Sequence, residues 1–133
     1  MGVSLYWRNL FLGHIFRVSS AAIPVAGYMA LFTSNPEPGD VAGVATGTEA
    51  TYTNYLRQAV TFASASGGVI ANSTAVTFPT SASAGGTATY AAFYDASSGG
   101  KLIGGFTIAA TSLASGAIPT IAIGACTMTA TTV

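Results

Sequence analysis

The segment that decides the fold is Tyr55 to Phe78, which holds two similar blocks, Tyr-Leu-Arg-Gln-Ala-Val-Thr-Phe at 55–62 and Ala-Asn-Ser-Thr-Ala-Val-Thr-Phe at 71–78. Three apolar residues of the first block fall on one face of an extended strand: Leu56, Val60 and Phe62. Small residues with two glycines follow, and the second block again alternates between apolar and polar residues. This pattern predicts two antiparallel strands joined by a glycine-containing turn.

The chain of 133 residues is poor in charge. Only 6% of its residues are charged, whereas about 25% is usual in soluble domains. The hydrophobic fraction is 50% and the formal net charge is zero. A chain of this length is expected to form a single β-sandwich domain over 1–133. Because charge normally protects a surface from association, we expect partners, including further copies of the chain, to cover part of this surface.

Further strands are predicted on both sides of the deciding segment. The stretch 28–33 is apolar on both faces, which indicates a central strand. The stretches 87–95 and 102–108 flank a glycine-rich loop and predict a hairpin, with a bulge or close backbone approach at Gly104-Gly105. Two more short strands bring the total to about seven: 118–123 and 126–133. Such a series is typical of an antiparallel β-sandwich, of either jelly-roll or immunoglobulin-like strand order.

A short helix is expected before the strands, over about 4–16. Ser4 is a suitable N-cap, and apolar residues then occupy almost the whole circumference. A helix of this kind has to be buried on more than one side, either in a groove of its own domain or against a neighbouring protein. Its interface candidates are Leu5, Trp7, Phe11 and Phe16. The run is too polar to span a membrane because it contains Arg8, Asn9, His14 and Arg17.

A long loop is expected over about 34–53, where prolines, glycines and small residues disfavour regular structure. It carries Glu37, Asp40 and Glu49, whose spacing matches no calcium-binding loop motif. A solvated or partner-binding loop is therefore preferred over a metal site, and no metal or cofactor is expected. Glu49 and Arg57 are further interface candidates, because Arg57 is expected to pair with a carboxylate either within the chain or across an interface.

The sequence shows no catalytic constellation. His14 is the one histidine, and no G-x-S-x-G elbow accompanies it, so we expect a non-enzymatic protein with a structural imidazole at the junction of helix and sandwich. Cys126 is alone and forms no intrachain disulfide. Four scattered cations are too few for a nucleic-acid interface. Six aromatic residues at strand spacing are expected in the core rather than in a sugar-binding platform: Tyr55, Phe62, Phe78, Tyr90, Phe93 and Tyr94.

Several blocks carry a resemblance to a known family. They are 28–33 (Tyr-Met-Ala-Leu-Phe-Thr), 57–62 (Arg-Gln-Ala-Val-Thr-Phe), 76–79 (Val-Thr-Phe-Pro) and the hairpin at 93–100. Over almost its whole length the chain resembles a family of small bacteriophage structural proteins that are commonly labelled tail fibre proteins. The resemblance implies a virion component, assembled in the host cytoplasm, without catalytic residues or a cofactor.

Three functions are compatible with these observations. The first is a capsid decoration or cement protein, a homo-oligomer that stabilises the shell by binding the major capsid protein or other virion proteins. The second is a tail, collar or fibre-attachment component present at low copy number. The third, and most remote, is a carbohydrate-binding module that uses the tyrosines. Neither nucleic acid nor a membrane is expected as a partner.

Overall fold

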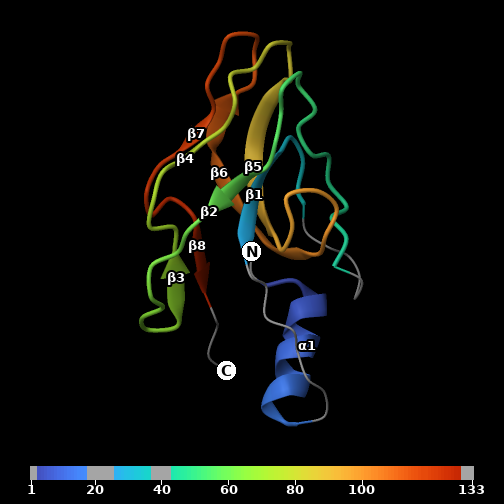
Figure 1. The fold of residues 1–133 in the computed structure, drawn as a ribbon, viewed down its shortest axis with the longest axis vertical. Helices are drawn as coiled ribbons and strands as arrows, with labels where there is room; N and C mark the ends of the chain where they lie inside the picture. Colours follow the sequence, from blue (N-terminus) through green and yellow to red (C-terminus); the bar gives the residue numbers. More distant parts are fainter. Residues whose placement is uncertain (1–2, 18–25, 37–42, 130–133) are drawn as a thin grey trace.

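A four-stranded antiparallel sheet with the order β2-β1-β5-β6 forms the centre of the molecule (Figure 1). The computed structural model describes residues 3–17, 26–36 and 43–129. The strands of this sheet are β1 (Gly27–Phe32), β2 (Gln58–Val60), β5 (Thr87–Tyr94) and β6 (Leu102–Ser112). The structure thereby gives the strand order that the sequence left open.

Strands β1 and β5 lie side by side in the middle of this sheet and are buried on both faces. Met29 and Leu31 point to one face of β1, and Ala30 and Phe32 point to the other; all four are buried. The two strands pair in register, with Ala30 opposite Ala92. The predicted central strand is therefore confirmed, and the fold needs cover on both sides of it.

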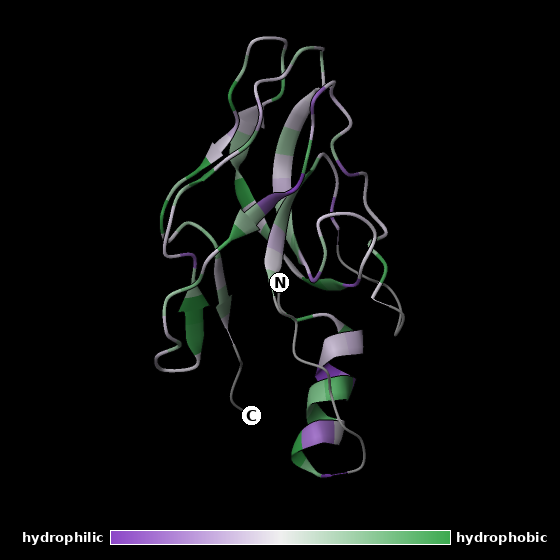
Figure 2. Ribbon diagram, viewed as in Figure 1, coloured by the Kyte–Doolittle hydropathy of each residue, from purple (hydrophilic) through white to green (hydrophobic). Residues whose placement is uncertain are grey.

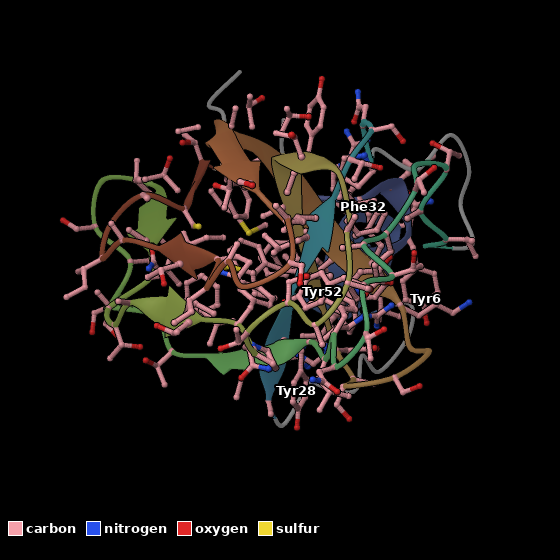
Figure 3. The ribbon with its side chains drawn as sticks, turned by 90° about the horizontal axis from the view of Figure 1, so that it is seen from above. Tyr6, Tyr28, Phe32 and Tyr52 are labelled. Carbon is pink, nitrogen blue, oxygen red and sulfur yellow. The ribbon has the colours of Figure 1, made fainter. Side chains whose placement is uncertain are left out.

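A second layer covers one face of the sheet in two short pieces. One piece pairs β3 (Val69–Ala71) with β8 (Thr127–Thr129), and the other pairs β4 (Val76–Thr77) with β7 (Thr120–Ile121). The main core lies between the layers, and Figure 3 shows Tyr52 among the side chains that fill it. Its largest members include Met29, Leu31, Phe78, Phe93 and Leu113. The chain is thus mainly β and antiparallel, with one described helix, as the sequence predicts.

The two blocks at 55–62 and 71–78 do not form the predicted hairpin ladder. They meet at one bridge, Phe62 opposite Asn72, with hydrogen bonds from Ala63 N to Ala71 O and from Ser73 N to Thr61 O, both 2.9 Å. Otherwise β2 pairs with β1, β3 with β8 and β4 with β7. The predicted antiparallel pairing is therefore present only at this bridge, because an alternating pattern identifies a strand's faces but not its neighbours.

Leu56 also lies elsewhere than predicted. Its side chain is 66% exposed, while Val60 is buried and Phe62 packs against the core. The regular strand begins only at Gln58, so the period of two does not extend back to Leu56. Instead, Tyr55 packs against the core from this segment.

The β5–β6 hairpin is present as predicted, and its outer edge is partly covered. The register of β6 shifts next to Gly104, which confirms the expected bulge. The N-terminal segment approaches here: Val3 bridges Gly104, and the Ser4 N–H donates to the carbonyl oxygen of Ile103 at 2.6 Å. A second irregularity lies between Ala88 and Tyr90 of the partner strand β5. These features protect an edge that has no charged side chain beyond residue 101.

Asn72 fastens the second layer together. Its buried amide donates to Thr74 O at 2.8 Å and to Ala122 O at 2.9 Å, and its Oδ1 accepts from Cys126 N at 3.0 Å. Its backbone also bonds Cys126 O and Gly124 N. One side chain therefore organises the turn between β7 and β8. Asn72 also begins the sequence Asn-Ser-Thr, which has the form of an N-glycosylation site. Because this amide is buried, it is not at the surface, where a glycan would be attached.

Replacing Asn72 by Ala is expected to lower the free energy of unfolding by about 3 kcal/mol, because the buried N–H of Cys126 and the carbonyls of Thr74 and Ala122 lose their partner. Urea unfolding of the purified variant measures this change. Asn9→Ala, at an exposed position, is the matched control and should change the value by less than about 0.5 kcal/mol. Equal effects of the two substitutions would show that the clamp contributes nothing.

Candidate interaction site

Helix α1 (Leu5–Ile15) extends from one end of the long axis of the molecule (Figure 1). Its start is anchored by Ser4, whose Oγ donates to Leu102 O at 2.7 Å and lies 3.5 Å from the N–H of Trp7. Ser4 is buried, but no residue of the helix itself is. Of the two placements that the sequence left open, a groove of its own domain does not agree with the structure. None of the described helices is long and apolar enough to cross a membrane.

The base of α1 makes limited contact with the β body. Leu5, Tyr6 and Trp7 are half-buried, the rings of Tyr6 and Trp7 meet edge to face at 5.5 Å, and Lys101 Nζ lies 5.4 Å from the Tyr6 ring. The indole Nε1 of Trp7 is buried and has no hydrogen-bond partner among the described residues; an unpaired buried donor of this kind costs about 1–3 kcal/mol. Two of the predicted interface residues, Leu5 and Trp7, are thus partly used within the chain.

The outer turns of α1 expose large apolar side chains. The exposed fractions are 62% for Phe11, 52% for Leu12, 52% for Ile15 and 73% for Phe16, and Figure 2 shows the hydrophobic bands on these turns. Phe11 and Phe16 were interface candidates from the sequence, whereas Leu12 and Ile15 were missed. The signal that identifies them is the spacing of three and four residues, which places them on the same stripe of a helix.

Arg57 is bound entirely within the chain. Its Nε and Nη2 donate to the two carboxylate oxygens of Glu49 at 2.8 and 2.7 Å, and Nη1 donates to Gly99 O at 2.7 Å and to Ala96 O at 3.3 Å. Its guanidinium carbon lies 3.6 Å from the centre of the Tyr94 ring. The Arg57 side chain is only 10% exposed and that of Glu49 is 26% exposed. Of the two pairings that the sequence left open, the structure has the intrachain one.

The segment that supplies Glu49 runs beside β1 and replaces a strand there. Glu49 bridges Phe32, and the Ala50 N–H donates to Leu31 O at 2.8 Å. The Leu31 N–H in turn donates to the Tyr55 hydroxyl at 3.0 Å, and this hydroxyl donates to Glu49 Oε1 at 2.9 Å. The backbone groups of β1 that lie beyond its pairing with β2 thereby find hydrogen-bond partners in a loop and in the Tyr55 side chain.

Burial of this network changes the acidity of its tyrosines. Burial raises the pKa of Tyr55, and the nearby Glu49 carboxylate raises it further. Burial also raises the pKa of Tyr94 to about 12, although the positive Arg57 works in the opposite direction. For Arg57, burial is the largest influence and lowers the pKa, but the hydrogen bond to Glu49 and the charges of Glu49, Tyr94 and Tyr55 together raise the pKa above its usual value. The network therefore holds neutral tyrosines around one ion pair.

The described residues contain no group of three or more His, Cys, Asp or Glu side chains that could hold a metal ion. Glu37 and Asp40 lie outside the described residues, and Glu49 is occupied by Arg57. His14 lies in the last turn of α1 and is exposed, about 15 Å along the helix from Ser4. The prediction that the His14 imidazole lies at the junction of helix and sandwich is therefore wrong.

The remaining candidates for ligand chemistry are packed inside the β body. Cys126 is buried, and burial raises its pKa to about 12. The six aromatic residues that might have formed a sugar platform are buried or packed against one of the two cores: Tyr55, Phe62, Phe78, Tyr90, Phe93 and Tyr94. The exposed outer turns of α1 are the strongest candidate for an interaction site.

Replacing Arg57 by Ala is expected to lower the free energy of unfolding by about 2 kcal/mol, because a mostly buried Glu49 carboxylate loses its charge partner. Arg57→Lys should give an intermediate loss, since an ammonium cannot bind both carboxylate oxygens in the same fork. Thermal or urea unfolding measures both. Arg8→Ala removes an exposed arginine and serves as the control; a loss no larger than that of the control would contradict the buried pairing.

Stability is expected to fall as the pH rises from about 10 to about 12. The pKa of Tyr94 is raised from 10.0 to about 12 in the folded chain, so the folded state holds this proton more tightly than the unfolded state. The contribution is therefore complete below pH 10 and is lost as the pH passes through the folded value. Urea midpoints across this range test it. Tyr94→Phe should make the dependence shallower without abolishing it, because the pKa values of Tyr55 and Cys126 are also raised in the folded chain. A constant midpoint in the parent, or an unchanged slope in Tyr94→Phe, would refute it.

One comparison with known proteins identifies the family. The model of a protein family described as podophage GP4 fiber I protein gp80 matches residues 2–129. No curated protein matches the chain. The family match confirms the resemblance to phage structural proteins labelled as tail fibre proteins. Because the match covers nearly all of the 133 residues, the chain belongs to the podophage GP4 fiber I protein family and is a structural component of a phage virion.

Proposed function

We propose that the protein is a non-enzymatic component of a podophage tail fibre, present at low copy number in each particle. The observation that carries this proposal is the family match over residues 2–129. A fibre component is attached at one end and free at the other. The proposal therefore predicts two ends of different character.

The shape of the molecule supports this proposal. Helix α1 lies at one end of the long axis, and the β4–β5 and β6–β7 loops lie at the other (Figure 1). Ser81 ties these two loops together, since its N–H donates to Ala117 O at 2.8 Å and its carbonyl accepts from Gly116 N at 2.7 Å. The far end is thus a connected set of loops built from small, uncharged residues.

The use of polar side chains inside the protein supports a structural role. The buried polar residues of the described chain are Ser4, Asn72 and Ser81, and each one bonds to backbone groups. Arg57 and Glu49 bind each other and the β5–β6 turn. These groups maintain the fold.

A capsid decoration or cement protein is the second candidate. The observation in its favour is that the described residues build one β body and one short helix rather than a shaft. A decoration protein binds the shell in many copies, whereas a fibre component binds at a few positions. The two functions therefore differ most clearly in stoichiometry.

The test is the copy number in purified particles, measured by quantitative mass spectrometry against the major capsid protein. A tail-fibre component is expected at a few copies per hundred shell subunits. A ratio near one per shell subunit would instead establish decoration of the capsid. Absence from the particles would refute both functions.

A further inference from the structure

We propose that the outer turns of helix α1 insert into an apolar groove on another protein of the virion, and that this groove carries carboxylates at its rim. The inference rests on the proposed function, because it names the kind of partner that holds the fibre component in the particle. It is carried by the width of the exposed apolar stripe, its area and its charge.

The exposed stripe is too wide for a simple helix–helix seam. With about 100° between successive residues, Phe11, Leu12, Ile15 and Phe16 spread over an arc of about 140°. A seam between two helices uses a narrower stripe of a and d positions. An arc of this width is covered fully only by a surface that contacts the helix from two sides, as a groove does.

The exposed area argues in the same direction. The four side chains are between 52% and 73% exposed, which corresponds to on the order of 450 Å² of apolar surface. Two such helices paired with each other would bury roughly 900 Å², below the ~1,200 Å² at which stable interfaces begin. A groove also covers the flanks of the helix and buries its own walls, so it buries more area than a second helix does.

The charge of the helix selects the chemistry of the partner. Arg8 is exposed and lies within the arc of the stripe, three residues before Phe11. The two carboxylates among the described residues are already engaged within the chain: Glu49 binds Arg57, and Asp95 accepts from the Lys101 N–H at 2.6 Å. Parallel pairing of two copies would also bring two Arg8 side chains together. A partner with an apolar groove and carboxylates at its rim would bind both the apolar stripe and Arg8.

The test places a photoreactive benzoylphenylalanine at Phe16 of the full chain, produced during phage infection, and maps cross-links in purified particles. Cross-links to a different virion protein, in a segment that combines apolar residues with Asp or Glu, are expected. Cross-links between copies of this chain, cross-links to lipid, or none in particles that contain the chain would overturn the proposal.

Incorporation of variants into particles provides the second measurement. Phe11→Ser with Phe16→Ser, and separately Arg8→Glu, are expected to lower the copy number per particle at least tenfold, whereas Arg8→Lys retains it. Ile123→Ser is the matched control, because Ile123 is 67% exposed in the β body. All variants should keep the melting temperature of the parent, since the replaced side chains are exposed. If the parent is present in particles and the variants are incorporated equally well, the groove is refuted. If the parent itself is absent from particles, the virion function is refuted instead.

Discussion

The pairing of β1 with β5 is the constraint on which the rest of the structure depends. Both strands are apolar on both faces, and Ala30 and Ala92 meet at their centre without exposure to solvent. A sheet of this kind is unstable until each face is covered, because burial of apolar surface provides most of the favourable free energy of folding. The remaining elements can be understood as two covers, built by different means.

One cover is a layer of short strands, and the other is a loop. On the first face, the paired strands β3–β8 and β4–β7 supply apolar side chains, and Asn72 holds their connecting turn. On the second face, the segment around Ala45 packs over Phe32, Ala92 and Tyr94. The Arg57–Glu49 pair fixes this loop to the sheet and to the β5–β6 turn. The ion pair is thus placed where an irregular segment has no strand ladder to hold it.

The local part of this architecture could be predicted from the sequence, and the long-range part could not. The β5–β6 hairpin joins neighbouring segments, and the two-sided apolar pattern of β1 already requires a central position. The partners of β3 and β4 lie about 45 to 60 residues away, and alternation carries no information about which strand is adjacent. For the same reason, the structural role of Asn72 could not be predicted, because it depends on the turn near Cys126.

The candidate site shows the same division. The apolar character of α1 was evident from its composition. Its exposure depends on where the start of the helix is attached, which is the beginning of β6, through the contacts of Ser4 with Leu102 and Ile103. Arg57 was expected to pair with a carboxylate, but the sequence did not indicate which one. The choice between partners depends on a loop that follows β1, so it required the fold.

The scarcity of charge has a consequence for the solutions in which the protein can keep its shape. The described residues contain one ion pair, and its arginine is largely shielded from water. Dissolved salt weakens interactions between exposed charges over a distance of about 8 Å at physiological ionic strength, but here it finds almost nothing to screen. The β body is held by apolar contacts and by hydrogen bonds among uncharged groups. We therefore expect the stability of the described β body to depend little on the salt concentration.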